Sequence, residues 1–308
     1  MGKKIKKAYS VKLNRIVSLD DVNTKNREEL ELKCPYEGCR TSITYTEEHI
    51  RTYGEKSVII PAYFRLISEN SSPHSADCIY STIGELFSIA KKSMGMLESI
   101  EDNLFEFRLQ VISEHRQNKK NAKTSYIQEP SVQNVPINSK IIESGTKSAY
   151  LSTIKKILEL KSKMEEDNQL EKALVLKNGA KTINWNNFYF DKHDYYECYS
   201  LLENGAEHPI CIEGIIKKIN YFPEYGSRRV SIELYRLSNR KINGKTLVPS
   251  VFINFHGNNL YKKIREISNG GTPIKVAVYS DNINYYSKGF YLNINPNVYN
   301  EKQMHFWN

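Results

Sequence analysis

Two short clusters of thiol and imidazole side chains constrain this chain more than any other feature. The first cluster holds Cys34 and Cys39, and the second holds His74 and Cys78. Turn-forming residues flank both clusters, and turns suit metal ligands better than they suit core cysteines. Two ligand pairs separated by a longer segment are typical of a tetrahedral structural zinc site. We therefore predict that these four side chains bind a structural Zn²⁺ ion, with no coordination position left for catalytic water.

Other interpretations of the same residues stay open. A free cysteine most often behaves as a small buried hydrophobe, and five cysteines in 308 residues is ordinary usage. Three of the five nevertheless fall in the window from Cys34 to Cys78, which favours ligands. His49 is a rival fourth ligand, although no second ligand lies near it in the sequence. Cys198 and Cys211 are predicted core positions.

Thiolate ligands indicate a reducing compartment, and we expect a cytoplasmic protein. The first seven residues are polar and basic, unlike the apolar segment of a secretory signal peptide. The sequence has no apolar run of about 18 residues, so we predict no transmembrane helix and no membrane partner.

Positive charge is concentrated at the C-terminal end of the chain. Residues 208–308 hold 14 basic and 6 acidic side chains, a net charge of +8, whereas the remaining 207 residues hold 30 basic and 29 acidic ones. A positive field confined to one domain attracts polyanions and speeds their association. A basic domain can also be simply a soluble surface, so charge alone does not identify nucleic acid as the partner.

The length and the changes in pattern predict several segments. Apolar residues at three- and four-residue spacing predict a helix over 81–117 and another over about 147–165. Aromatic residues crowd 181–202, which predicts a strand with a short helix, interpreted as a packing bridge. The predicted organisation is a zinc-finger-like module at 1–80, a helical segment at 81–117, a linker at 118–146, a helix with the aromatic bridge at 147–207, and a barrel at 208–308.

The C-terminal part alternates in the manner of β-strands. Its predicted strands are 210–219, 230–237, 248–255, 274–279 and 290–294, and its predicted helix is 260–267. This order of elements resembles the OB-fold, a five-stranded barrel with a helix between its third and fourth strands. The expected fold class is therefore α+β, with an N-terminal zinc-binding β module, central helices and a C-terminal OB-like five-stranded β-barrel. Another small α+β barrel or sandwich would use the same pattern.

Aromatic and basic residues alternate in the predicted loops of this barrel. Flat rings stack on unpaired bases at about 1–3 kcal/mol each, while lysine and arginine neutralise phosphates. Each tyrosine alone is better explained by packing, but together they favour single-stranded nucleic acid, with DNA before RNA. The predicted contacts are Tyr221, Phe222, Tyr225, Arg228 and Arg229 in one loop, Arg240, Lys241 and Lys245 in a turn, Tyr285, Tyr286 and Lys288 in the loop 281–289, and Tyr235 and Lys275 on strands.

The residues around the two ligand pairs share a pattern with a known family. They are Val17–Val22, Cys34-Pro35 with Cys39, and Ala62–Arg65 followed by His74 and Cys78. This stretch, about residues 15–80, resembles the zinc-finger region that opens competence-protein CoiA-like proteins. In that family the module precedes a nuclease domain and is associated with handling DNA. The resemblance implies a bacterial or phage DNA-processing or defence complex with several protein subunits.

A nuclease of that kind needs an acidic residue and an acid-x-lysine pair on adjoining strands to hold Mg²⁺. Asp102, Glu159, Glu165 and Glu166 fall in stretches predicted as helix or helix end, and Glu233 has a tyrosine two positions later. No Walker, GxSxG or HExxH motif occurs.

The sequence therefore predicts a zinc-containing nucleic-acid-binding protein without an identified catalytic residue. Two rival functions stay open. One is a nuclease or nuclease subunit with its active site within 81–200, and the other is a protein–protein adaptor whose basic face meets an acidic partner.

Overall fold

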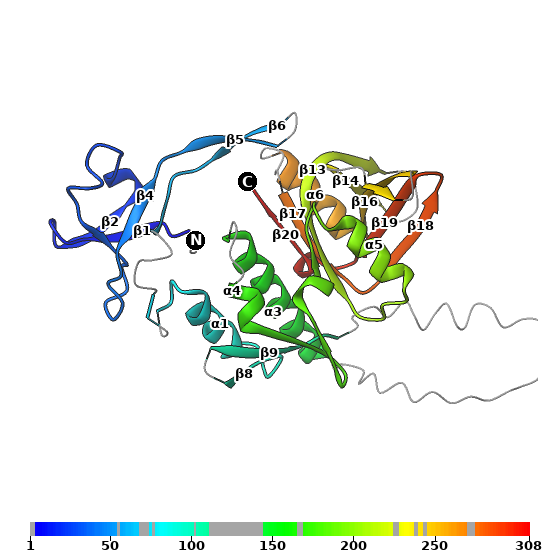
Figure 1. The fold of residues 1–308 in the computed structure, drawn as a ribbon, viewed down its shortest axis with the longest axis horizontal. Helices are drawn as coiled ribbons and strands as arrows, with labels where there is room; N and C mark the ends of the chain where they lie inside the picture. Colours follow the sequence, from blue (N-terminus) through cyan, green and yellow to red (C-terminus); the bar gives the residue numbers. More distant parts are fainter. Residues whose placement is uncertain are drawn as a thin grey trace, which may run out of the picture.

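The computed structural model describes residues 4–53, 56–67, 74–75, 78–101, 103–110, 144–164, 169–223, 228–236, 240–242, 245–269 and 275–308. The described chain is a mixed α+β protein in which strands outnumber helices. Figure 1 shows its arrangement: N-terminal strands on one side, the C-terminal sheet on the other, and α1, α3, α4, β8 and β9 between and below them. No described helix is both long enough and apolar enough to cross a bilayer.

The N-terminal strands form three small sheets, two of which share one apolar core. The strands are β1 (Lys7–Ser10), β2 (Arg15–Ser18), β3 (Leu32–Lys33), β4 (Ile43–Thr46), β5 (His49–Tyr53), β6 (Lys56–Ile60) and β7 (Tyr63–Leu66). β1 lies between β2 and β3, β4 pairs with β7, and β5 pairs with β6. Phe64 on β7 is fully buried and exchanges two backbone hydrogen bonds of 2.9 Å with Ile5. This contact joins the β4–β7 pair to the start of the chain.

The helix predicted over 81–117 is confirmed only by α1 (Thr82–Ala90) among the described residues, and residues 111–117 lie outside them. The prediction is wrong for β8 (Leu97–Glu101) and β9 (Leu104–Arg108), which form an antiparallel hairpin. Met94 and Gly95 have φ values of +54° and +79°, a left-handed backbone that ends a right-handed helical path. Of the apolar residues that matched a helical period, Leu97 and Phe107 instead pair across the two strands, and both are buried.

The second predicted helix is confirmed by α3 (Ser144–Ser162). After it come α4 (Gln169–Ala173), β10 (Leu174–Asn178), β11 (Lys181–Ile183), β12 (Tyr189–Phe190) and α5 (Tyr195–Glu203), so the strand and short helix predicted over 181–202 are also confirmed. β10 pairs in parallel with β9 and antiparallel with β11, which gives a sheet of order β11-β10-β9-β8. The predicted linker lies outside the described residues except where α3 begins.

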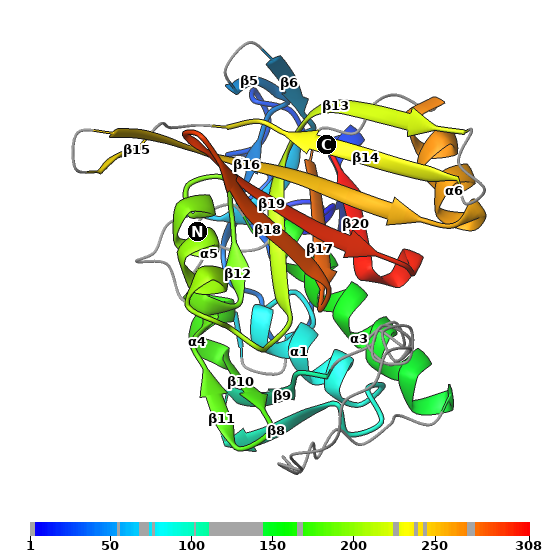
Figure 2. The ribbon, with the colours of Figure 1, turned by 90° about the vertical axis from the view of Figure 1, so that its right-hand side faces the viewer.

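The C-terminal part contains the predicted order of strand, strand, strand, helix, strand, strand, together with additional strands. Its elements are β13 (Ile210–Phe222), β14 (Arg229–Leu234), β15 (Arg240–Ile242), β16 (Lys245–His256), α6 (Asn258–Asn269), β17 (Lys275–Ser280), β18 (Ile283–Lys288), β19 (Tyr291–Val298) and β20 (Met304–Trp307). They form one long sheet of order β18-β19-β16-β14-β13-β17-β20 (Figure 2). Within it β16 and β19 run parallel, and β13 and β17 run antiparallel.

Two details of the predicted barrel are wrong. The sheet has nine strands rather than five when β12 and β15 are included, and no backbone ladder between described strands closes it into a barrel. Where β17 ends, hydrogen bonds join the chain to β19, from Asn297 N to Asn282 O (2.9 Å) and from Ser280 Oγ to Asn297 O (2.8 Å). The segment 281–289, predicted as a loop, contains edge strand β18. Almost all side chains of β18 are exposed, so its sequence lacks the alternation of apolar and polar residues that predicts a strand.

The central helices and the C-terminal sheet share a buried core. Tyr150 on α3 and Tyr279 on β17 are both fully buried, and their hydroxyl groups are 2.8 Å apart. Tyr279 Oη also donates to the backbone oxygen of Gln110 (2.8 Å), and Tyr150 Oη accepts from Gln110 N (2.8 Å). Because burial keeps both phenols from ionising, it raises the pKa of each above its ordinary value.

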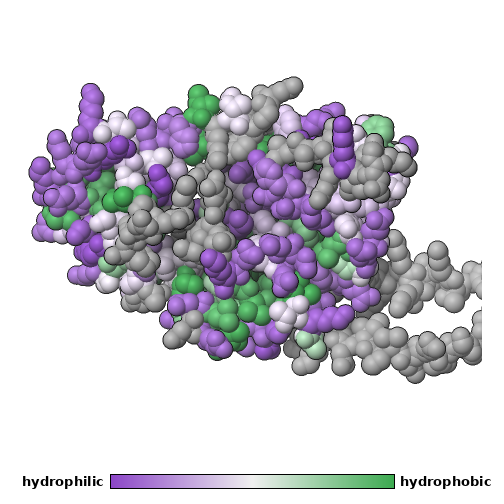
Figure 3. Space-filling model, in the orientation of Figure 1, coloured by the Kyte–Doolittle hydropathy of each residue, from purple (hydrophilic) through white to green (hydrophobic). Residues whose placement is uncertain are grey.

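Most of the surface seen in Figure 3 is hydrophilic, with an apolar patch near α1. Exposed apolar side chains close to α1 and β8 in the sequence are Ile79, Met94 and Ile100. Met94 is the most exposed of the three, because its left-handed backbone lies in the turn between α1 and β8.

Candidate metal centre and nucleic-acid interface

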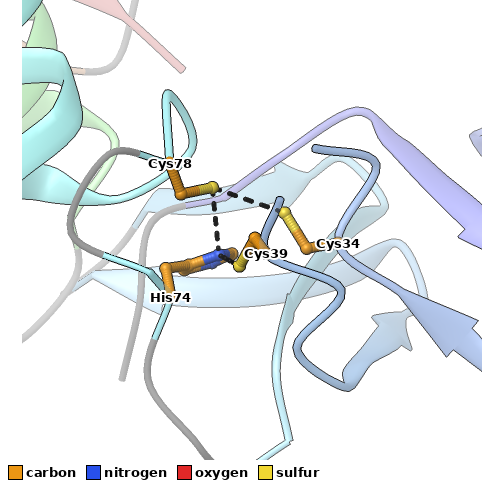
Figure 4. Close-up of side chains that lie close together, drawn as sticks. All are labelled: Cys34, Cys39, His74 and Cys78. Atoms are coloured by element: carbon orange, nitrogen blue, oxygen red, sulfur yellow. Dashed lines mark hydrogen bonds between the residues drawn. The ribbon is translucent and has the colours of Figure 1, made fainter. Parts of the chain in front are cut away.

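The four predicted metal ligands converge in space. Their ligand atoms all lie within 4.8 Å of one another (Figure 4). Cys34 Sγ is 3.5 Å from Cys78 Sγ, and His74 Nδ1 is 3.3 Å from Cys39 Sγ and 3.5 Å from Cys78 Sγ. In a tetrahedral zinc site, metal–ligand bonds of 2.0–2.3 Å place neighbouring ligand atoms about 3.5–3.8 Å apart. The cluster therefore has the spacing and the donor atoms to hold a metal ion.

Tight turns present the first pair of ligands. Cys34 directly follows β3, and its backbone N–H donates to Thr41 O (2.8 Å), which closes a loop back toward β4. Within that loop Cys39 N donates to Tyr36 O (3.0 Å). The loop thus points both thiols toward the same region, as Figure 4 shows.

The second pair lies immediately before α1. Cys78 N donates to Ser75 O (2.9 Å), which brings Cys78 back toward the residue that follows His74. Gly84 on α1 makes this approach possible, because a Cβ atom there would lie 2.1 Å from the backbone oxygen of Cys78. Any larger side chain at Gly84 would push α1 away from the ligand turn.

Electrostatics within the cluster favour a bound cation. Cys34 and Cys78 are fully buried, and burial raises the pKa of both thiols. Burial also opposes ionisation of Cys39, but hydrogen bonds from the backbone N–H groups of Thr41 and Ser75, together with the neighbouring thiols, lower its pKa overall. Three thiols this close cannot all ionise without a positive partner, because like charges repel strongly in a partly buried site. A divalent cation removes that repulsion.

The remaining histidine and cysteine candidates lie elsewhere. His49 starts β5, where its Nδ1 atom is 3.0 Å from the backbone oxygen of Glu47, and it is not part of the four-residue cluster. Cys198 and Cys211 are buried in the two apolar cores of the central and C-terminal parts, as predicted.

Several of the predicted nucleic-acid contacts fall into two groups on the C-terminal sheet. The first group, the β13–β14 cluster, consists of Tyr221, Phe222, Arg228 and Arg229. Arg229 lies over the ring of Phe222 at 5.0 Å. Tyr221 packs edge-on against Tyr261 of α6, with ring centroids 5.6 Å apart, and donates to Ser268 Oγ (2.9 Å). Its ring is thus engaged in packing, while both arginines are exposed.

The second group surrounds the turn between β18 and β19. Tyr286 on β18 is 53% exposed, and Lys288 is exposed directly opposite Tyr291 of β19. Phe290 (53% exposed) and Tyr291 (39%) pack with ring centroids 4.4 Å apart, and Arg236 lies 5.7 Å from the centroid of Tyr291. We call Arg236, Tyr286, Lys288, Phe290 and Tyr291 the β18–β19 patch.

Sequence reasoning missed three members of this patch. Arg236, Phe290 and Tyr291 were not predicted, because Phe290 and Tyr291 were read as the start of a strand and Arg236 as part of another. Tyr291 does begin β19, and Phe290 lies in the turn just before it, but both positions are exposed at this end of the strand. Tyr285, by contrast, is 41% exposed but contacts Tyr199 of α5 edge-on, with centroids 5.9 Å apart.

The other predicted contacts are more scattered. Tyr235 is half-buried just after β14, Lys241 is exposed on β15, and Lys275 is partly buried at the start of β17. Arg240 and Lys245 belong to β15 and β16, but their side chains lie outside the described part of the structure, as does all of Tyr225.

Comparisons with known proteins identify no family for this chain. No family model matches it, and no curated protein matches it. A similar solved structure is a small single-stranded DNA-binding protein from Mycoplasma pneumoniae, at 13% identity over 29% of this chain and 86% of that one, with a TM-score of 0.18. That TM-score is too low to support an inference. The CoiA-like resemblance of residues 15–80 therefore remains an expectation from the sequence.

In the described part of the chain, the hairpin β8–β9 brings two carboxylates and a basic side chain together on neighbouring strands. Glu98 and Glu106 are cross-strand partners, and Arg108 follows two residues after Glu106. Arg108 pairs with both carboxylates, at 3.3 Å to Glu98 and 2.9 Å to Glu106. The two acids raise the pKa of Arg108, chiefly through the hydrogen bond that its Nε donates to Glu106. A guanidinium held between the two carboxylates makes this group an ion-pair network instead of a magnesium site.

Proposed function

We propose that this chain is a zinc-stapled, non-enzymatic protein that binds single-stranded nucleic acid, with DNA as the preferred strand. The N-terminal module holds the zinc ion through Cys34, Cys39, His74 and Cys78, and the C-terminal sheet binds the strand. Thiolate ligands require a reducing compartment such as the cytoplasm. Assembly with other proteins in a DNA-processing or defence complex is part of the proposal.

The observation that carries the proposal is the β18–β19 patch. It combines three exposed aromatic rings with two cations on a sheet of net positive charge, and stacking rings with nearby cations are the elements that unpaired strands require. Lysine and arginine supply phosphate contacts without sequence preference. The rings are held by a strand hairpin, so their positions are set before a ligand arrives.

The strand order gives further support. The parallel β16–β19 pair and the antiparallel β13–β17 pair are connections that an OB-like sheet uses, and β14 and β16 correspond to its second and third strands. The β13–β14 cluster lies near the His256 end of β16, because Arg229 pairs with His256. The β18–β19 patch lies near Val248, the partner of Tyr291. Eight residues of strand place the two groups about 26 Å apart, within reach of one bound strand.

Fluorescence anisotropy with labelled oligonucleotides tests the proposal on the full-length chain. The full chain is used because Tyr279 of the sheet packs against Tyr150 outside it. We expect oligo-dT to bind at 50 mM salt and to weaken steeply as salt rises, with a log–log slope of about −0.7 for each phosphate contacted. Arg236→Ala and Lys288→Ala should each make the slope shallower by about 0.7.

Parallel arms distinguish the rival functions. Equal affinity for duplex and single strands would contradict the role of the exposed rings, and no binding of oligo-dT or oligo-U at 50 mM salt would refute nucleic-acid binding altogether. Tighter binding of oligo-U than oligo-dT would reverse the DNA preference. Cleavage of the oligonucleotide in Mg²⁺ or Mn²⁺ that Glu106→Gln abolishes would instead favour a nuclease.

A further inference from the structure

A cleft lies on the side of the C-terminal sheet where α3 and α6 meet β20. It encloses about 360 Å³ and is lined by Lys155 of α3, Lys263 and Ile267 of α6, and the C-terminal segment Glu301–Asn308 in part. None of its lining residues belongs to the β18–β19 patch or the β13–β14 cluster. The cleft is therefore a separate place on the molecule.

Two features of the lining are chemically specific. The first is an aromatic stack: the rings of His305 and Trp307 are 5.3 Å apart and nearly parallel, with an interplanar angle of 15°. The second is a pair of lysines, Lys155 and Lys263, from different helices. Neither lysine forms an ion pair with a residue that the structure describes, and Glu301 is the one acidic side chain among the lining residues.

The imidazole of His305 contributes to the stack without adding charge. Its Nε2 atom is 3.0 Å from Ser162 Oγ on α3. Burial, together with the charges of Lys155 and Lys163, lowers the pKa of His305 to about 4. At neutral pH the histidine is uncharged, so the positive charge of the cleft comes from the lysines. Lys163 is neutralised by Glu85, 2.9 Å away, which leaves Lys155 and Lys263.

We propose that this cleft binds a nucleoside phosphate, with the base against Trp307 and the phosphate between Lys155 and Lys263. The ligand class follows from the lining: a flat indole surface suits a nucleobase, and two lysines without acidic partners suit a phosphate. A cleft of about 360 Å³ falls within the usual range of small-ligand sites, roughly 300–1,000 Å³. The source is either a free nucleotide or the phosphorylated end of a strand, which share this chemistry.

Titration of the full-length protein with dAMP tests the proposal, using calorimetry and tryptophan fluorescence. Trp185, the other tryptophan, is 8% exposed, so quenching by dAMP is expected to come from Trp307. Lys155→Ala and Lys263→Ala should each weaken dAMP binding about tenfold or more, as expected for a lost charge-assisted contact. Lys156→Ala and Lys262→Ala are matched controls, since these neighbours do not line the cleft, and each should stay within twofold of the parent.

Further arms separate the contributions of base, phosphate and strand. We expect inorganic phosphate and deoxyadenosine to bind at least tenfold more weakly than dAMP. If Lys263→Ala weakens binding of a 5′-phosphorylated oligonucleotide more than binding of the same oligonucleotide without the phosphate, the natural ligand is the end of a strand. If the variant weakens binding of dAMP alone, the natural ligand is a free nucleotide. Absence of dAMP binding at millimolar concentration, or equal losses in the control variants, would overturn the proposal. A Tyr286→Ala variant should bind dAMP as the parent does, so this site can fail independently of the proposed function.

Discussion

The Sγ atoms of Cys34 and Cys78 lie 3.5 Å apart although 44 residues separate them in the chain. The antiparallel pairing of β4 with β7 returns the chain between them, with Ile43 opposite Leu66. A buried pair of thiols at this distance, with a third thiol and an imidazole beside it, gains most by sharing a cation.

Metal content is the first prediction. The purified protein should contain one zinc ion per chain, and Cys78→Ser should lose it, because three ligands hold a structural zinc far more weakly than four. Inductively coupled plasma mass spectrometry measures the stoichiometry. Cys198→Ala is the matched control, a fully buried cysteine outside the cluster that should leave zinc unchanged. Wild-type protein prepared without chelator and free of zinc would contradict the prediction.

Removing the metal should loosen one part of the chain and spare the other. Because the ligand turns are joined through the cluster, a strong chelator should expose the N-terminal strands to protease while the C-terminal sheet, with its own apolar core, stays resistant. Limited proteolysis followed by mass spectrometry locates the cuts. Cuts that appear at equal rates in both parts after chelation would show that the metal has no local role.

Tyr286 provides the test of base stacking. Tyr286→Ala should weaken oligo-dT binding by about 1–3 kcal/mol, the usual contribution of one stacked base. Tyr286→Phe keeps the ring and should retain nearly all the affinity, which separates stacking from a hydroxyl hydrogen bond. Ile50→Ala controls for loss of an exposed apolar side chain, since Ile50 is 70% exposed on β5. Equal affinities for the alanine and wild-type proteins would remove Tyr286 from the interface.

Tyr279 should stabilise the contact between the central helices and the sheet. Tyr279→Phe removes a hydroxyl that bonds both Tyr150 Oη and Gln110 O, and buried partners left unpaired cost about 1–3 kcal/mol. We expect the free energy of unfolding, measured by urea denaturation, to fall by that amount. Tyr286→Phe, at an exposed site, should change it by less than about 0.5 kcal/mol. A Tyr279→Phe protein as stable as the parent would show that water replaces the lost contacts.

His305 should make the protein less stable in mild acid. Its folded pKa of about 4 lies below the ordinary value of 6.5, so the unfolded chain binds a proton that the folded chain does not. Protonation of His305 in the unfolded chain therefore lowers the free energy of unfolding as the pH falls from 6.5 to 4, and has no effect on it above pH 6.5. His305→Gln should therefore have a shallower loss of stability across that window, by urea denaturation at successive pH values, and the same dependence as wild type above pH 7. Identical slopes between pH 4 and 6.5 would contradict the prediction.

The metal site was the part of the function most accessible to sequence reasoning. A ligand pair with fixed spacing is a local pattern, and cysteine and histidine are the side chains that commonly bind zinc. The β18–β19 patch was only partly accessible: Tyr286 and Lys288 were predicted as contacts, but their place on a strand was not. Edge strand β18 is held by backbone hydrogen bonds to β19. Because backbone groups are nearly the same in every residue, this pairing leaves no pattern in the sequence from which the strand could be predicted.

Local spacing and alternation in the sequence were sufficient for the ligand pairs, for α3, and for the order of strands and helix after residue 208. Tertiary structure alone decided that residues 97–108 form a hairpin instead of a helix, that β19 lies parallel to β16, and that the sheet does not close into a barrel. The physical reason is that the spacing of apolar residues in the sequence indicates which side chains avoid water. Strand pairing, in contrast, depends on contacts between segments far apart in the chain. Such contacts are decided only when the whole core packs.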